Sequence, residues 1–504
     1  MRCVSIGFLV FSLVGCGGAD APRRTNSPLV EAEVGFVPIP GDSYHLGSEI
    51  LTSGPAELFY NLQPANDGSD GAPLFVISGG GPGAAVLLLT MAMAPAAVLR
   101  GEDGSTRVGE LSSSLTQLGN LLFIDARCSG FSYSVADSRE RGTRFGPGDF
   151  NVFRDAADVA LATIEVVGQH PELLASDVVF VTESYGGARV AALLDYFLSS
   201  GTNSPLHPFR SPQLDTRIEN FQRDRLAAVE PGGAVPTFRG QILLQPIIAG
   251  ALQDELAGAL FEEPGSIIDQ LASEHGAEYV RCAEQTEPCD PFTNAHALLS
   301  RIDVSRYDDR ARASWLDALL AVGTALADTP PALARVLGVD EGEIEAILRD
   351  RPEGAFRFET TTSDDTSALI DRLGPLPPYD AFFTALNHDV FYAMHSVEVE
   401  ALGAHPDAPA LAELFVANAR RTPTLVTRAA HDLHVYAPAL PPVLERLPGV
   451  SSARDSDSAI ELALDDGGSL VVDAPWFPDG SHTVALDEPD RLLGVLGEWI
   501  AHPR

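Results

Sequence analysis

The chain of 504 residues is longer than one compact core usually is, so two domains, or one core with a large insertion, are expected. Hydrophobic residues make up 45% and charged residues 20%, which is typical of a folded globular protein. The net charge is −37 and the sequence contains no lysine, which excludes lysine chemistry and argues against nucleic-acid binding; a well-solvated acidic surface is the simpler interpretation.

The first residues resemble a bacterial export signal. Arg2 precedes an apolar run at residues 4–14, which is too short to span a bilayer and is typical of a signal peptide. The run ends in Leu13-Val14-Gly15-Cys16, which resembles the lipoprotein cleavage box and implies removal of residues 1–15 and lipidation of Cys16. Ordinary secretion with a fortuitous cysteine is the alternative. Gly17 resembles the pattern for outer-membrane sorting, so we expect a protein exported to the cell envelope that contacts the membrane only through its lipid.

Downstream of a polar tether at residues 16–34, strand and helix patterns alternate as far as residue 249. Apolar runs of strand length lie at residues 44–52, 56–62, 72–78, 121–125, 178–183 and 240–248. Helical patterns lie between them at 152–170 and 188–198. Runs that are apolar throughout are typical of strands buried on both faces, so we predict the α/β class, with a mostly parallel central sheet and helices on both faces.

The segment of residues 250–420 interrupts this alternation with short helical stretches, of which 313–326 and 341–349 are examples. After it, two strand patterns and a closing amphipathic helix follow, at 424–430, 469–473 and 489–500. We therefore predict a core of residues 35–249 and 421–504 with a mostly helical cap inserted at 250–420.

Export implies an oxidising compartment, where Cys282 and Cys289 are close enough in sequence to form a local disulfide. Cys128 is then left over, and we expect it to be buried and inert. No cysteine or histidine spacing is typical of a zinc site, and no metal or organic cofactor is expected.

The apolar run at 178–183 leads into Ser184, which is followed by Tyr185, Gly186 and Gly187. A serine at the sharp turn between a central strand and a helix is the arrangement that exposes a nucleophilic hydroxyl. Gly186 satisfies the need for a very small residue two positions on, whereas Thr182 replaces the usual glycine two positions before. Such a match also occurs by chance, so catalysis requires partners elsewhere in the chain.

A nucleophilic serine needs a base and a carboxylate that orients it. Asp432 follows the resumed strand, and His482 lies between the last strand and the closing helix, so the order is Ser184, Asp432, His482. This is the order of an α/β-hydrolase triad. Alternatively, Asp432 caps the N-terminus of a helix, and His482 is an ordinary loop histidine.

A glycine-rich loop, Gly79-Gly80-Gly81-Pro82-Gly83, follows the strand pattern at 72–78. Its backbone can approach a developing oxyanion closely, and we predict that the N–H groups of Gly81 and Tyr185 form an oxyanion hole. A phosphate-binding loop is the competing interpretation, but the sequence lacks the required Gly-Lys-Ser/Thr ending.

Four stretches together resemble the serine carboxypeptidase family, the carboxypeptidase Y-like branch of the α/β-hydrolases. They are Gly80-Gly-Pro-Gly83; Asn120-Leu-Leu-Phe-Ile-Asp125 with Ser129-Gly-Phe-Ser-Tyr-Ser134; His170-Pro-Glu-Leu with Glu183-Ser-Tyr-Gly-Gly187; and Ser481-His-Thr-Val-Ala-Leu-Asp-Glu-Pro489. The resemblance implies an α/β-hydrolase fold and a serine-type carboxypeptidase that cleaves peptides through a triad and an acyl-enzyme.

The departures from that family concern the substrate. In the family, an asparagine before Gly-Gly-Pro-Gly and the glutamate before the nucleophile bind the terminal carboxylate of the peptide. Here the asparagine position is Gly79, while Glu183 is present, so the resemblance places substrate binding at Gly79, Gly80 and Glu183. Glu183 could bind a carboxylate only when protonated, which favours acidic pH; it is otherwise an acid at a helix N-terminus. An esterase, an aminopeptidase and a non-catalytic binding lipoprotein are the alternatives.

Overall fold

The computed structural model describes residues 32–46, 49–68, 71–100, 106–135, 148–199, 211–229, 237–276, 279–291, 330–350, 411–430, 435–480 and 482–502, together with residues 294, 295, 298, 394 and 432. All of them lie in the unit Glu31–Arg504. The predicted signal peptide, Cys16 and the helix predicted at 313–326 lie outside the described residues.

One large sheet organises this unit. Its strands follow one another in the order β1 (Glu33–Ile39), β4 (Ala56–Gln63), β8 (Asn120–Ile124), β5 (Leu74–Ser78), β10 (Val178–Glu183), β11 (Phe238–Leu244), β12 (Thr424–Val426), β16 (Ser469–Asp473), β15 (Ala459–Leu464) and β14 (Val450–Asp455). The six strands from β8 through β5, β10, β11 and β12 to β16 are parallel to one another, whereas β4 is antiparallel to both β1 and β8, and β15 is antiparallel to β16. This order, with an antiparallel second strand, is that of an α/β-hydrolase, so the predicted fold class is confirmed.

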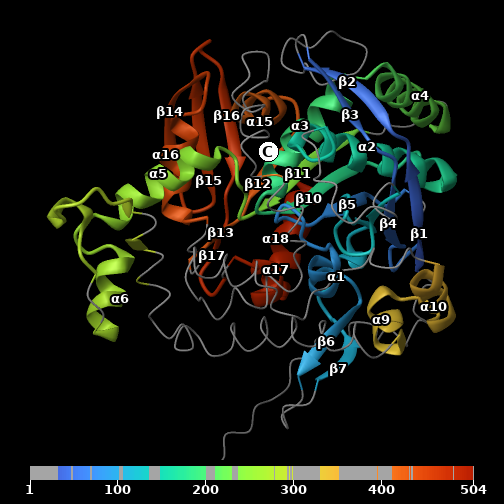
Figure 1. Ribbon diagram of the computed structural model, residues 1–504, viewed down its shortest axis with the longest axis horizontal. Helices are drawn as coiled ribbons and strands as arrows, with labels where there is room; N and C mark the ends of the chain where they lie inside the picture. The colour runs from blue at the N-terminus through green and yellow to red at the C-terminus, as the bar shows by residue number, and fades with distance from the viewer. Residues whose placement is uncertain are drawn as a thin grey trace, which may run out of the picture. The chain divides into compact units, whose positions relative to one another are not determined.

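Helices cover both faces of the sheet because the central strands are apolar on both faces. In β5 and β10, Leu74, Val76, Val178 and Phe180 pack into the cluster that contains α2 (Val152–Gln169) and α3 (Gly186–Leu198). Their alternate residues, Phe75, Ile77, Val179 and Val181, pack instead with α1 (Leu87–Met93), α17 (Val484–Asp487) and α18 (Pro489–Ala501). Figure 1 shows these two groups of helices on opposite sides of the central strands. Successive residues of a strand point to opposite faces of the sheet. Each central strand therefore contributes side chains to two hydrophobic cores, one on each face.

Two strand predictions need correction. The run predicted as one strand at 44–52 is an antiparallel hairpin of β2 (Asp42–Leu46) and β3 (Glu49–Ser53), because the turn-forming pair Gly47-Ser48 interrupts it in the sequence. The hairpin of β14 and β15, which extends the sheet beyond β16, was not predicted from the sequence. In β15 the exposed Glu461 and Ala463 alternate with the buried Ile460, Leu462 and Leu464, and Glu461 interrupts the apolar run in the sequence.

The segment predicted as a cap contributes α5 (Gly250–Phe261), α6 (Ile267–His275), α9 (Pro330–Leu337), α10 (Glu341–Asp350) and α15 (Leu411–Ala419). The helix predicted at 341–349 is confirmed as α10. The carbonyl oxygen of Leu337 in α9 accepts a hydrogen bond from Asn61 in β4 (2.7 Å), and Asn418 in α15 donates to the Ala191 carbonyl in α3 (2.6 Å). These helices therefore hydrogen-bond to the second strand of the sheet and to a core helix, and the division into core and cap stays a prediction.

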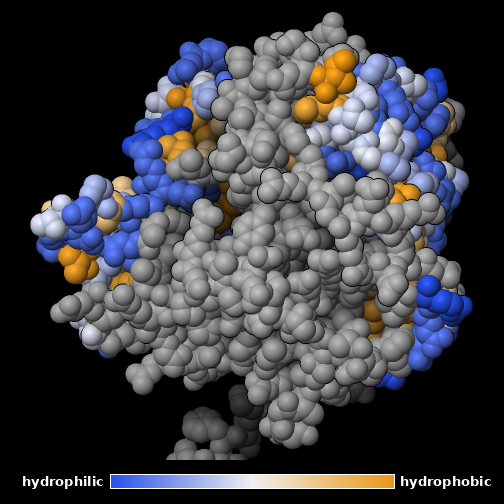
Figure 2. Space-filling view, viewed as in Figure 1, coloured by the Kyte–Doolittle hydropathy of each residue, from blue (hydrophilic) through white to orange (hydrophobic). Residues whose placement is uncertain are grey.

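A disulfide joins Cys282 to Cys289, whose Cα atoms are 5.4 Å apart. Cys128, which we expected to be buried, forms no disulfide and is only half-buried. In Figure 2, hydrophilic side chains cover most of the described surface on this face, and hydrophobic ones form small separate areas. No helix within the described residues combines the length and the apolar character that crossing a membrane requires.

Candidate active site

Ser184 lies at the sharp turn between β10 and α3. Its φ angle of +54° is in the left-handed region, which residues other than glycine rarely adopt. Three backbone hydrogen bonds hold this conformation. Ser184 N–H donates to the Leu244 carbonyl (2.9 Å), and the Ser184 carbonyl accepts from Gly187 (2.9 Å) and Ile247 (2.8 Å). The strained, over-determined turn is the geometry of a nucleophile elbow.

Thr182, the departure from the usual motif, is accommodated by Gly186. The Thr182 hydroxyl is fully buried and donates to the Ser78 carbonyl (3.0 Å), which ties β10 to β5. A Cβ atom on Gly186 would lie 1.6 Å from Thr182 Oγ1. The threonine thus occupies the space that the missing side chain of Gly186 leaves free, and the pair keeps the elbow tight.

This contact predicts a strong effect of Gly186→Ala. Because two buried atoms would overlap, we expect the free energy of unfolding to fall by roughly 1–3 kcal/mol, measured by urea denaturation. Adding Thr182→Gly should recover most of that loss. Gly168 in α2 has open space around its Cα, so Gly168→Ala is the control and should be neutral or stabilising. An equal loss in the double variant would contradict the steric explanation.

The glycine-rich loop lies against the elbow because β5 and β10 are neighbours in the sheet, with Ser78 paired to Thr182. A Cβ atom on Gly80 would lie 2.6 Å from the Glu183 carbonyl oxygen and 3.0 Å from Ser184 Cβ, so only glycine permits this approach. Among the described residues, the N–H groups of Gly81 and Tyr185 donate to no acceptor. Two unused donors on either side of the serine are what an oxyanion hole requires.

Asp432 and His482 come together because their loops follow β12 and β16, which pair in the sheet. Asp432 is buried; its Oδ1 accepts from the Val435 N–H, and its Oδ2 lies 3.0 Å from His482 Nδ1. A neutral His482 that donates from Nδ1 to this carboxylate keeps its lone pair on Nε2, the form that a general base needs.

The pKa of His482 reflects two opposing effects. Burial of the imidazole lowers the pKa, but the Asp432 carboxylate, the hydrogen bond to it and the nearby charges of Glu183 and Asp487 raise it by more. The net shift is upward, so the imidazolium that forms during proton transfer is stabilised.

Glu183, directly before the nucleophile, is buried at the end of β10. Burial raises the pKa of its carboxyl to about 7; the His482 charge opposes this shift, and Asp432 and Asp487 add to it. Glu183 therefore changes protonation state near neutral pH, next to the triad histidine. Gly79 offers no side chain there, and a Cβ atom on it would lie 3.1 Å from the Ala84 carbonyl oxygen.

Asp125 supports the loops beside the site, a role that was not predicted from the sequence although its motif was noted. Its Oδ1 accepts from the Val86 N–H (2.7 Å), and its Oδ2 accepts from the Phe131 N–H (2.8 Å). It thereby connects the chain after the glycine-rich loop to the Gly-Phe-Ser loop. The signal was present: a carboxylate directly after a buried strand of a parallel sheet lies at the edge where ligands bind.

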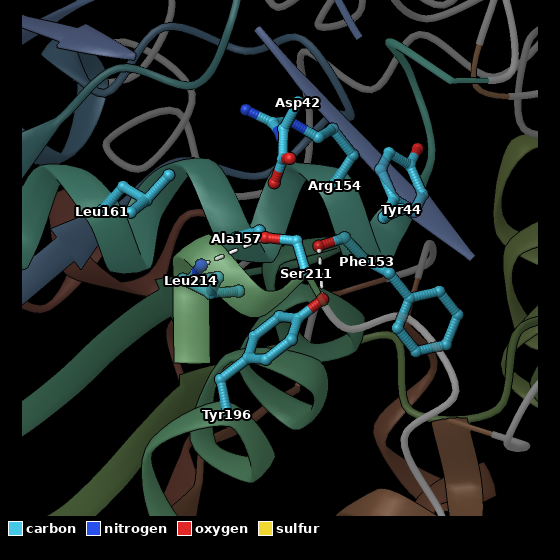
Figure 3. A pocket seen from close by; sticks show the side chains of 9 residues that line it. All are labelled: Asp42, Tyr44, Phe153, Arg154, Ala157, Leu161, Tyr196, Ser211 and Leu214. Atoms are coloured by element: carbon cyan, nitrogen blue, oxygen red, sulfur yellow. Dashed lines mark hydrogen bonds between the residues drawn. The ribbon is translucent and has the colours of Figure 1, made fainter. Parts of the chain in front are cut away.

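A second hollow, between β2, α2, α3 and α4 (Pro212–Ala228), is not the active site. Figure 3 shows Asp42, Arg154 and Tyr196 on its walls. Its lining contains no pair of nucleophile and base, and Tyr196 lies about 16 Å along α3 from Tyr185. The chemistry therefore belongs to the carboxyl ends of β5, β10, β12 and β16.

The chain is similar to several hydrolases of known structure, at low sequence identity. No curated protein matches the chain significantly. Among solved structures, the prohormone-processing carboxypeptidase Kex1 of Saccharomyces cerevisiae is 14% identical, with a TM-score of 0.46 and coverage of 93% of this chain and 90% of that one. A Mycobacterium smegmatis proline iminopeptidase (12% identical, TM-score 0.38, 92% and 97% covered) and a Thermogutta terrifontis esterase (12%, 0.36, 93% and 98%) are also similar.

The family model of the serine carboxypeptidases matches residues 43–209, the part that contains the glycine-rich loop and the elbow. Three of the four stretches behind the predicted resemblance fall within it. The resemblance of this chain to the serine carboxypeptidase family is thereby confirmed, and the chain is a serine hydrolase.

Proposed function

We propose that this protein is a serine-type carboxypeptidase. Ser184 attacks the last peptide carbonyl and passes its proton to His482 Nε2, while Asp432 holds the imidazole by its Nδ1–H. The N–H groups of Gly81 and Tyr185 bind the oxyanion. His482 then protonates the leaving amine, and water hydrolyses the acyl-enzyme by the same route in reverse.

Buried Glu183 is the observation that carries the choice of substrate. With a pKa of about 7, its carboxyl holds a proton at mildly acidic pH and can then donate a hydrogen bond to the carboxylate at the end of a peptide. Gly79, in place of the asparagine of the related family, supplies no second side-chain donor. Recognition of the terminal carboxylate is therefore assigned to Glu183.

The same residue supports one alternative. Above neutral pH the ionised Glu183 carboxylate would attract the ammonium group of a free amino terminus, which favours an aminopeptidase. Simple esters would need neither form of Glu183. Parallel assays with N-blocked peptides, free-amino peptides and esters separate the three substrate classes, and a strong preference for a free amino terminus would exclude the carboxypeptidase.

Ser184→Ala tests the proposed function. Wild type should release the C-terminal residue from N-blocked dipeptides near pH 7, and the variant should be slower by at least about 10⁴-fold, since it lacks the nucleophile. A fluorophosphonate probe should label wild type and not the variant. Equal background rates for both proteins would refute the peptidase, and absence of labelling would instead support a non-catalytic binding protein.

We further propose that the enzyme is exported and anchored in the cell envelope by a lipid on Cys16, in agreement with the cleavage box at residues 13–16. Labelled palmitate should then be incorporated into wild type and not into Cys16→Ser.

A further inference from the structure

Arg189 is a fully buried charge one helical turn beyond the elbow. It has no exposed surface, and it is the largest fully buried side chain among the described residues. Removing a guanidinium from water is costly unless its hydrogen-bonding groups find partners. Its partners therefore indicate what the charge does there.

Those partners lie around the predicted oxyanion hole. Nε donates to Asp155 Oδ2 in α2 (2.7 Å). Nη1 donates to Ser78 Oγ (3.2 Å) and to the Gly79 carbonyl, at the start of the glycine-rich loop. The guanidinium carbon also lies 5.3 Å from the centre of the Tyr185 ring. One side chain thus contacts the residues that carry or precede both proposed oxyanion donors.

We propose that Arg189 is a positioning residue of this active site, whose guanidinium fixes the glycine-rich loop against the nucleophile elbow and so sets the geometry of the oxyanion hole. The proposal rests on the proposed function, because it assigns to Gly81 and Tyr185 the role of oxyanion donors. Arg189 touches neither the serine nor the substrate and acts through the loop.

The loop needs such support because its backbone is intrinsically free. Gly81 and Gly83 have φ angles of +106° and +89°, and a run of glycines loses much conformational entropy when ordered. Oxyanion donors must lie about 2.7–3.1 Å from the oxygen they stabilise. Contact with the elbow limits how closely Gly80 approaches, and the hydrogen bond from Arg189 prevents the Gly79 carbonyl from moving away.

The fork of the guanidinium is suited to this task. Nε points to an acid in α2 while Nη1 points to β5 and the loop, so one rigid plane connects three elements. A lysine ammonium could neutralise Asp155, but it could not also donate hydrogen bonds to Ser78 and to the Gly79 carbonyl in the same geometry.

A double variant separates positioning from simple stability. Arg189→Met alone would leave the mostly buried Asp155 carboxylate without its arginine partner, so Asp155→Asn is added to remove that charge. On an activated ester we expect kcat of Arg189→Met/Asp155→Asn to fall about 100-fold, as for a displaced catalytic group, with KM within about threefold of wild type. The urea midpoint should lie close to that of wild type. Wild-type kcat in this folded double variant would overturn the proposal.

Two further variants sharpen the result. Arg189→Lys should have a urea midpoint close to that of wild type but a reduced kcat. Wild-type kcat with lysine would show that the forked hydrogen bonding of the guanidinium is not needed and would overturn that part of the proposal. Arg225 is the matched control: it is a buried arginine in α4 that donates to the Ser176 carbonyl (2.6 Å) away from the elbow. Arg225→Met should lower the urea midpoint and leave kcat within twofold; a 100-fold loss there would show that any buried arginine has this effect and would overturn the proposal.

Ser184→Ala, assayed on the same ester, keeps the two hypotheses distinguishable. If Ser184→Ala is inactive and the Arg189 variants are fully active, the positioning role fails and the proposed function stands. If Ser184→Ala retains wild-type turnover, the proposed function fails, and the positioning role fails with it.

Discussion

Asp432→Asn is expected to lower kcat about 10⁴-fold while the protein stays folded. The asparagine oxygen can still accept from the Val435 N–H, so the loop keeps its local hydrogen bond. Its amide nitrogen then faces His482 Nδ1 and donates to it, which favours the tautomer with the proton on Nε2. That tautomer cannot accept the proton of the Ser184 hydroxyl, so kcat falls although the protein stays folded.

The measurement is kcat on an activated ester together with the free energy of unfolding. Asp455 is a suitable control because it is a half-exposed acid paired with Arg428 in the same part of the sheet. Asp455→Asn should leave kcat unchanged and lower the free energy of unfolding only modestly, because the asparagine Oδ1 can still accept the hydrogen bond from the buried Arg428. If Asp432→Asn kept kcat within tenfold of wild type, Asp432 would not be the orienting acid.

The triad could be predicted from the sequence because topology constrains it strongly. Ser184, Asp432 and His482 each follow a strand of one parallel sheet, and the carboxyl ends of such strands meet at one edge. Chain order and strand pattern therefore bring them near one another without any knowledge of side-chain packing. The same reasoning placed the glycine-rich loop beside the elbow.

Features that depend on packing were missed. The partnership of Thr182 with Gly186 depends on a single interatomic distance, and no sequence pattern encodes it. The sequence pattern predicts no special role for Arg189 within its helix. Its side chain is nevertheless fully buried and contacts the glycine-rich loop. Hairpin β14–β15 was missed because Glu461 and Ala463 of β15 are exposed to water, and the charged Glu461 interrupts the continuous apolar run that marks central strands.

Glu183 predicts that hydrolysis of N-blocked dipeptides is lost at alkaline pH. Binding a terminal carboxylate requires the protonated carboxyl, whose pKa is about 7, so kcat/KM should fall about tenfold for each pH unit above 7. At pH 9 the loss is about 100-fold. The matching dipeptide amide carries no carboxylate and should lack this alkaline decline.

His482 sets the opposite limb of the pH profile. It must be neutral to accept the proton from Ser184, so activity falls as pH drops through its pKa, and the upward shift of that pKa moves this limb toward neutrality. The productive form thus holds one proton on Glu183 and none on His482 Nε2. Because the two groups interact, the pair titrates as a unit and the profile should be a narrow bell.

Glu183→Gln tests both limbs at once. A neutral amide donor remains at all pH values, so the alkaline decline should disappear, and kcat/KM at pH 9 should exceed that of wild type by about tenfold or more. The acid limb should move to lower pH, because the Glu183 charge that raises the pKa of His482 is gone. An unchanged alkaline limb would show that another group titrates there, whereas loss of free-amino peptide hydrolysis alone would identify an aminopeptidase. The direction of each limb therefore decides which end of the peptide this buried carboxyl recognises.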